Sequence, residues 1–133
     1  MSASPAVLIV EDEESILLSL EFLLRNAGCA VDSARNGEAA LAALSRPPPA
    51  LVLLDVMLPG IDGYELCRRI RNDPRLQQTR VILLTARGRD ADLQKGIDAG
   101  ADAYLTKPFS TRELVAQVQA LLARPRGGAQ GSM

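Results

Sequence analysis

Five short apolar segments recur along the chain, and stretches with apolar residues at helical spacing separate them. The apolar segments are Ala6–Val10, Ala30–Val31 with its neighbours, Ala50–Leu54, Val81–Leu84 and Ala103–Leu105. Three of the five are nearly continuous Val, Ile and Leu without polar alternation, which is typical of strands buried on both faces. The pattern therefore predicts a parallel sheet that is covered by helices.

The stretches between the apolar segments predict five helices. They cover about Glu14–Ala27, the residues from Asn36 to Leu44, Tyr64–Asn72, Asp90–Ala99, and the residues from Ser110 to Leu122. Asn36 and the Ser110–Glu113 capping box are expected to begin two of these helices. Glycines or prolines follow every helix and are expected to end it: Gly28, Pro47–Pro49, Pro74, Gly100 and Pro125.

The inward faces of these predicted helices follow from the same spacing. Leu17, Leu20 and Leu24 form the inward face of the first helix, and Leu66, Cys67 and Ile70 that of the third. The fourth helix is weakly apolar, and its main anchors are predicted to be Leu93 and Ile97. We expect few buried contacts to hold this helix.

Because a strand and a helix alternate five times, we expect a (βα)5 α/β fold: one open, doubly wound parallel sheet with helices on both faces. A chain of 133 residues matches one domain. We assign residues 5–124 to this domain. The polar, glycine-containing stretch 125–133 is expected to be a disordered tail or the remnant of a linker.

Composition excludes several classes of site. The 15 basic and 16 acidic residues give a net charge of −1, so we expect no direct nucleic-acid binding and no membrane binding by this chain. The absence of histidine excludes histidine-dependent catalysis and the common zinc sites. Cys29 and Cys67 are predicted to be free, buried thiols, and without a signal peptide or membrane segment a cytoplasmic location is expected.

Chemically active residues follow four of the apolar segments. Glu11 and Asp12 come after the first, Asp55 after the third, Thr85 after the fourth and Lys107 after the fifth. Since ligands of open α/β sheets bind at the carboxyl ends of the strands, these side chains converge if the strands are neighbours.

Three carboxylates without histidine or cysteine favour a hard cation such as Mg²⁺, with Mn²⁺ as the alternative. A cation, a lysine and a hydroxyl together suit a phosphoryl group, and a neighbouring carboxylate can attack that group. The residues thus predict Mg²⁺-dependent phosphoryl chemistry on an aspartate. They leave open which aspartate reacts, and whether hydrolysis or signalling follows.

At these positions the sequence resembles the receiver domain of two-component response regulators, from about Ala6 to Ala123. The motifs that carry the resemblance are V-L-I-V-E-D-E, L-V-L-L-D-V-M-L-P-G-I-D-G, V-I-L-L-T-A, G-A-D-A-Y-L and T-K-P-F. The resemblance implies a flavodoxin-like, chemotaxis-regulator-like fold with strand order 2-1-3-4-5. It also implies a signalling switch rather than an enzyme, apart from its own phosphorylation and slow dephosphorylation.

The resemblance implies a role for each site residue. Asp55 would accept the phosphoryl group from the phosphohistidine of a sensor histidine kinase or phosphotransfer protein. Asp12, Asp55 and the backbone carbonyl of Met57 would ligate Mg²⁺, and Glu11 would act mainly through metal-bound water. Lys107 would pair with Asp55 before phosphorylation and with the phosphoryl oxygens afterwards, and its bond to Pro108 would be cis.

The resemblance also implies a switch. Thr85 would move to a phosphoryl oxygen, Tyr104 would turn inward, and the small Ala86 would leave room for the donor. The face made by the fourth helix, the fifth strand and the fifth helix would then bind a downstream partner, as a monomer or a phosphorylation-dependent homodimer. The resemblance places Met57 and Arg87 at positions that tune dephosphorylation in the family. Since neither side chain activates water well, a long-lived phosphoryl state is predicted.

Two alternatives stay open. An Mg²⁺-dependent phosphatase with an aspartate nucleophile would use similar groups, but it needs a second aspartate where Met57 stands. The chain could also be the receiver of a larger DNA-binding regulator or hybrid kinase. The winged-helix class of such regulators often pairs an acid and a base across a dimer, and Ala103 and Gln117 replace these residues here.

Overall fold

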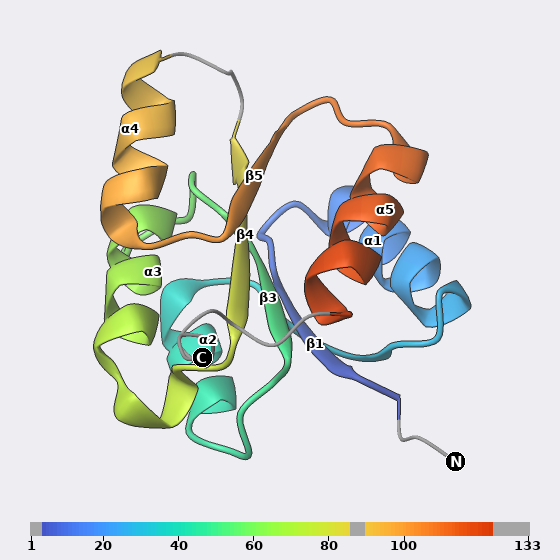
Figure 1. The fold of residues 1–133 in the computed structure, drawn as a ribbon, viewed down its shortest axis with the longest axis horizontal. Helices are drawn as coiled ribbons and strands as arrows, with labels where there is room; N and C mark the ends of the chain where they lie inside the picture. Colours follow the sequence, from blue (N-terminus) through green and yellow to red (C-terminus); the bar gives the residue numbers. More distant parts are fainter. Residues whose placement is uncertain (1–3, 86–89, 124–133) are drawn as a thin grey trace, which may run out of the picture.

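The computed structural model describes residues 4–85 and 90–123. Within these ranges, five strands alternate with five α-helices (Figure 1). The strands are β1 (Ala6–Val10), β2 (Ala30–Ala34), β3 (Leu51–Asp55), β4 (Arg80–Thr85) and β5 (Ala103–Thr106). The helices are α1 (Glu14–Asn26), α2 (Gly37–Leu44), α3 (Gly63–Asn72), α4 (Asp90–Ala99) and α5 (Thr111–Leu122). A short 3₁₀ helix, η1 (Pro74–Leu76), follows α3 and was not predicted.

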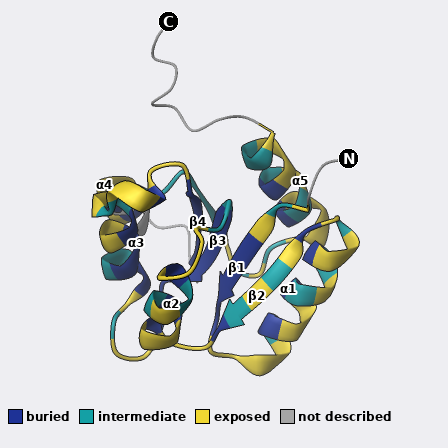
Figure 2. Cartoon of the chain, turned by 90° about the horizontal axis from the view of Figure 1, so that it is seen from below, coloured by how far each residue is buried: buried dark blue, intermediate teal, exposed yellow. Residues whose placement is uncertain are grey.

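The strands form one parallel sheet with the order β2-β1-β3-β4-β5, which confirms the predicted fold class. The three continuous apolar segments became the three central strands, and every residue in them except Ala6 is buried. The edge strand β2 alternates between exposed and partly buried residues over most of its length (Figure 2). Burial on both faces therefore explains the difference in polarity between central and edge strands.

Helices cover both faces of the sheet. Helices α1 and α5 lie on one face, and α2, α3 and α4 lie on the other (Figure 1). Neighbouring strand residues serve opposite cores, because side chains alternate along a strand. The core under α1 and α5 includes Val7, Ile9, Leu20, Leu24, Leu53, Ile82 and Leu114. The core under α2, α3 and α4 includes Leu8, Val10, Ala40, Leu54, Leu66, Ile70 and Leu83.

The predicted helix ends are confirmed where the structure describes them. The side chain of Asn36 accepts a hydrogen bond from the Ala39 N–H at 2.8 Å, and Ser110 Oγ accepts one from the Glu113 N–H at 2.9 Å. Gly28 has φ of +94° directly after α1, a left-handed conformation that favours glycine. The predicted tail 125–133, with Pro125, lies outside the described residues.

The prediction that Ile97 anchors α4 is wrong, because its side chain is 56% exposed. The helix instead turns its small residues inward. Gly96 lies against Leu83 of the sheet, and Ala99 is buried with its carbonyl oxygen 3.3 Å from Sγ of Cys67. Small residues let α4 lie close to β4 and α3, so the bulky Ile97 points away. The other predicted anchor, the Leu93 side chain, lies outside what the structure describes.

Other expectations hold in the parts of the chain that the structure describes. Cys29 and Cys67 are buried thiols that are not joined in a disulfide, as predicted. No described helix is both long and apolar enough to cross a membrane. The Lys107–Pro108 peptide bond is cis.

Replacing Ile97 with alanine tests the packing of α4. We expect the free energy of unfolding to change by no more than about 0.5 kcal/mol, because an exposed side chain leaves no cavity. The matched change Ile82→Ala removes a fully buried side chain and should cost about 2–5 kcal/mol. Urea denaturation of both variants measures the difference, and a comparable loss in Ile97→Ala would contradict the packing described for α4.

Candidate functional site

The candidate site is built where the parallel strands end. Backbone hydrogen bonds extend the sheet by one residue beyond three of these ends. The Glu11 N–H donates to the Ala34 carbonyl at 3.0 Å, the Val56 N–H to Leu84 at 3.1 Å, and the Lys107 N–H to Thr85 at 2.6 Å. The residues that follow β1, β3 and β5 are thus held by the sheet rather than by free loops.

Three carboxylates meet at this edge. One oxygen from each of Glu11, Asp12 and Asp55 lies within 4.8 Å of the others. Glu11 is 1% exposed and Asp55 is 4% exposed, whereas Asp12 is exposed to solvent. Since burying a charged group without a partner is costly, the two buried carboxylates need compensation.

Lys107 supplies part of that compensation. Its Nζ donates to Glu11 Oε1 at 3.1 Å and to Asp55 Oδ2 at 3.2 Å. The remaining oxygen of each carboxylate accepts a backbone hydrogen bond, Asp55 Oδ1 from the Met57 N–H at 3.0 Å and Glu11 Oε2 from the Glu13 N–H at 3.1 Å. One ammonium group and two backbone N–H groups therefore hold both carboxylates in place.

The pKa values reflect this crowding. Burial raises the pKa of Glu11, and repulsion from Asp55 raises it further, against the hydrogen bonds from Glu13 and Lys107. Burial alone would lower the pKa of Lys107. Attraction from Asp55 and Glu11 outweighs burial, so the pKa of Lys107 lies above its ordinary value and the side chain stays protonated at neutral pH.

The donor set fits a divalent cation. The three carboxylates face one lysine, so two negative charges stay without a compensating side chain within the cluster. All of its side-chain donors are carboxylate oxygens, the ligands that Mg²⁺ and Mn²⁺ prefer. The cluster can therefore hold a hard divalent ion.

Thr85 and Tyr104 lie on the same face of the sheet. Thr85, 3% exposed, ends β4 opposite Thr106, while Tyr104 on β5 lies opposite Leu83. Residues two apart on a strand point to the same side, so the two switch candidates both face the layer of α3 and α4. Tyr104 is partly buried against the core on that side.

Of the remaining predicted residues, the structure describes only Met57. The side chain of Met57 is 70% exposed, two residues after Asp55. Ala86 and Arg87 lie outside the described residues. Sequence reasoning missed two contacts: the backbone N–H of Met57 on Asp55, which no residue type signals, and the bond from Lys107 to Glu11. The second joins the ends of β5 and β1, which are separated by two strands.

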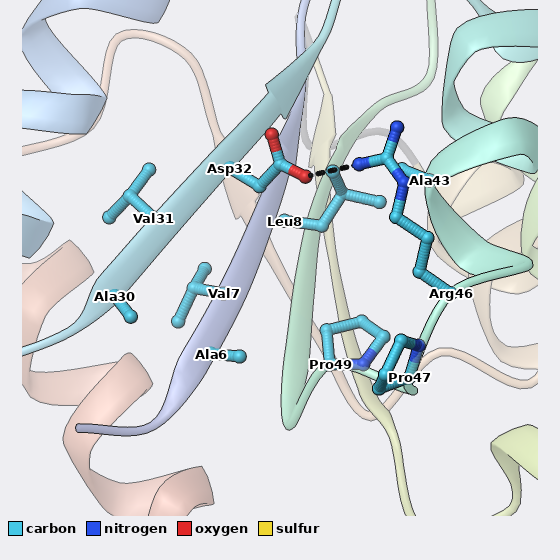
Figure 3. A pocket seen from close by; sticks show the side chains of 10 residues that line it. All are labelled: Ala6, Val7, Leu8, Ala30, Val31, Asp32, Ala43, Arg46, Pro47 and Pro49. Carbon is cyan, nitrogen blue, oxygen red and sulfur yellow. Dashed lines mark hydrogen bonds and ion pairs between the residues drawn. The ribbon is translucent and has the colours of Figure 1, made fainter. Parts of the chain in front are cut away.

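A pocket of about 260 Å³ lies at the other end of β1 and β2 (Figure 3). Ala6, Ala30 and Pro49 are among the residues that line it. Its charged side chains, Asp32 and Arg46, pair with each other at 3.2 Å and are both more than half exposed. Its charges are thus already matched, and it shares no residue with the acidic cluster.

A family model of the response regulator receiver domain matches residues 7–119. The chain belongs to this family. The receiver is similar to the phosphate regulon transcriptional regulatory protein PhoB of Rhizobium meliloti, with 43% identity over 92% of this chain and 54% of the relative. The chain thus spans about half the length of the curated relatives it matches.

Solved structures show the same fold. A putative response regulator from Chloroflexus aurantiacus superposes with a TM-score of 0.87 at 42% identity, covering 91% of this receiver and 99% of that chain. The receiver domain of the sensor histidine kinase PA1611 from Pseudomonas aeruginosa superposes with a TM-score of 0.84 at 31% identity, covering 92% of this receiver and 100% of that chain. The latter structure has a magnesium ion coordinated in its active site cleft.

Replacing Lys107 with methionine tests the charge balance of the receiver's site. We expect the free energy of unfolding in EDTA to fall by about 1–3 kcal/mol, because two buried carboxylates lose their shared cation. Mg²⁺ should stabilise the variant more than the wild type, since it neutralises the same groups.

Lys95→Met is the matched control, because Lys95 is exposed and lies over the Tyr64 ring rather than at a carboxylate. Thermal unfolding with and without Mg²⁺ measures both effects. Equal stabilisation by Mg²⁺ in Lys107→Met and wild type would contradict the charge balance described above.

Proposed function

We propose that this receiver is a phosphorylation-activated signalling switch in which Asp55 accepts a phosphoryl group from the phosphohistidine of a histidine kinase or phosphotransfer protein. The observation that carries the proposal is the cluster itself: the Asp55 carboxylate lies among Glu11, Asp12 and the Lys107 ammonium group. Of the three carboxylates, Asp55 is the one that is both buried at a strand end and central in the sheet.

In the proposed reaction, an oxygen of the Asp55 carboxylate forms a bond to phosphorus while the P–N bond to the partner's imidazole breaks. The electron pair of that bond leaves with the imidazole nitrogen. Lys107, 3.2 Å from Asp55 before the reaction, then pairs with the phosphoryl oxygens. The reaction consumes one phosphoryl group per protein, so the receiver acts as an acceptor rather than as a turnover enzyme.

We assign the cation site to Asp12, Asp55 and the backbone carbonyl of Met57, with Glu11 in support. When bound, Mg²⁺ would neutralise charge on the phosphoryl oxygens, and Mn²⁺ could replace it. The three clustered carboxylates support this assignment, as does the magnesium ion of the Pseudomonas receiver. Lys107 alone leaves too much negative charge at the site for an incoming phosphoryl group.

The switch would run from Thr85 to Tyr104. Phosphorylation adds about two negative charges at the end of β3. The Thr85 hydroxyl would move to a phosphoryl oxygen, and Tyr104 would fill the space that it leaves. Their position on one face of the sheet supports this coupling. The reshaped surface would be that of α4, β5 and α5, where a downstream partner or a second receiver would bind.

We also propose that residues 5–124 act as the receiver domain of a longer regulator. Curated relatives that match at about half their length carry transcriptional regulatory names. The phosphatase alternative is less well supported, because Met57 stands where its second aspartate is needed. Next to the dimer position Ala103, Asp102 accepts a hydrogen bond from the Val81 N–H at 2.8 Å, so it has a role within the fold.

Incubation with Mg²⁺ and acetyl phosphate tests the phosphoacceptor. We expect the intact mass to rise by one phosphoryl group in the wild type. The Asp55→Asn variant and the wild type in EDTA should stay unmodified, because they lack the nucleophile or the cation. Unchanged wild-type mass, under conditions that label a control receiver, would count against the proposal. Continuous phosphate release from varied phosphomonoesters would favour a phosphatase.

The residue at position 57 tests the lifetime of the phosphoryl group. We expect slow loss of phosphate from the wild type, because the side chain of Met57 cannot accept a proton from water. Met57→Glu should accelerate the loss roughly tenfold by supplying a proton acceptor, whereas Met57→Leu should leave it unchanged. The decay of the phosphorylated mass over time gives the rate. Wild-type hydrolysis within minutes would overturn the prediction of a long-lived state.

A further inference from the structure

Gly63 begins α3 directly against the backbone of the proposed phosphoacceptor. Its N–H donates to the Val56 carbonyl at 3.1 Å. A Cβ on Gly63 would overlap the carbonyl oxygen of Asp55, and it would lie 2.6 Å from the Cα of Val56 and 3.0 Å from the carbonyl carbon of Asp55. Real Cβ atoms essentially never come so close to a backbone atom, so any other residue here must move the chain.

Position 63 requires glycine because of a close contact with the neighbouring backbone, and not because of its own backbone conformation. The described glycines with a left-handed φ are Gly28, Gly60 and Gly100, and Gly63 is not one of them. Among the described glycines, Gly63 also differs in what its Cβ would meet. At Gly96 the nearest atom is Cδ1 of Leu83, the end of a side chain that can shift, and at Gly37 it is the side-chain Cβ of Ile61 at 2.9 Å. At Gly63 the three nearest atoms all belong to the backbone.

Helix α3 cannot easily retreat from this contact. The side chain of Asp62 accepts a hydrogen bond from the Glu65 N–H at 2.9 Å and fixes the first turn of α3. Further along, the helix buries Leu66, Cys67 and Ile70 in the core. Since interiors are close-packed, a new methyl group at Gly63 would push part of the displacement onto Asp55 and Val56.

We propose that Gly63 is a positioning residue for the phosphoryl acceptor. By carrying no side chain, it lets the first turn of α3 lie against the Asp55 peptide and sets where the Asp55 carboxylate stands relative to Glu11, Asp12 and Lys107. The inference rests on the proposed role of Asp55. It adds that the reactivity of this carboxylate depends on a van der Waals contact made by a helix that supplies no group to the acidic cluster.

The Gly63→Ala variant tests the inference at a temperature where circular dichroism shows it to be folded. We expect its rate constant for phosphorylation, at saturating acetyl phosphate and Mg²⁺, to fall roughly 10- to 100-fold, because displacements near 1 Å misalign reacting groups. The Mg²⁺ concentration for half-saturation, measured by calorimetry without phosphoryl donor, should rise as well. A role in folding alone would lower the unfolding temperature and leave both quantities unchanged.

Gly100→Ala is the matched control. Its methyl group would overlap the Arg71 side chain, and its φ of +92° disfavours alanine, so the variant is also strained. Gly100 precedes β5, at the end of the sheet away from the acidic cluster. Per folded molecule, this control should keep the rate constant and the Mg²⁺ affinity of the wild type.

The outcomes separate the two proposals. A wild type that acetyl phosphate does not label would refute the role of Asp55, whatever Gly63 does. A labelled wild type with equal rate and Mg²⁺ affinity in Gly63→Ala would overturn the role of Gly63, as would equal losses in Gly63→Ala and Gly100→Ala.

If Gly63→Ala does not fold, Asp62→Ala loosens the same turn and should lower the rate several-fold. A folded Asp62→Ala variant with wild-type behaviour would then overturn the inference.

Discussion

Two carboxylates are buried side by side at the end of the sheet, and one ammonium group binds both. Glu11 and Asp55 are both buried, and Lys107 donates to both of them from the end of the edge strand β5. The arrangement is stable only because the parallel strands bring their ends to one edge and because backbone N–H groups bind the remaining oxygens. The metal binding and phosphoryl transfer proposed for this receiver depend on that partly compensated charge.

The buried charge is compensated well enough for the protein to fold, but enough negative charge remains to bind a cation. Lys107 and the two backbone hydrogen bonds satisfy the buried oxygens, yet the cluster keeps an excess of negative charge. Such an excess favours a divalent cation, and a bound cation in turn makes an anionic phosphoryl group tolerable. A site that was fully neutral would have no affinity for the metal, and a site without Lys107 would bury two unpaired charges.

The sheet could be predicted from the sequence because the residues of each central strand indicate that the strand is buried. The runs Val7–Val10 and Leu51–Leu54 carry no polar alternation, and only burial on both faces explains that. Pairwise contacts were less predictable. Ile97 has the spacing of an anchor but points outward, because α4 packs through Gly96 and Ala99. The bond from Lys107 to Glu11 depends on a long side chain crossing the sheet edge, which no local pattern encodes.

The same contrast in packing divides the site into a rigid side and a side that can move. On the rigid side, β3 and α3 meet backbone to backbone at Gly63, a contact with no side chain that could rearrange. On the other side, α4 packs through two small buried residues: Gly96 lies against Leu83 of the sheet, and the Ala99 carbonyl lies against Cys67 of α3. A contact between fixed backbones transmits position, whereas a small apolar contact costs little to change. We therefore expect α3 to keep its place when the charge at Asp55 changes, and α4 to be the helix that moves in the proposed switch.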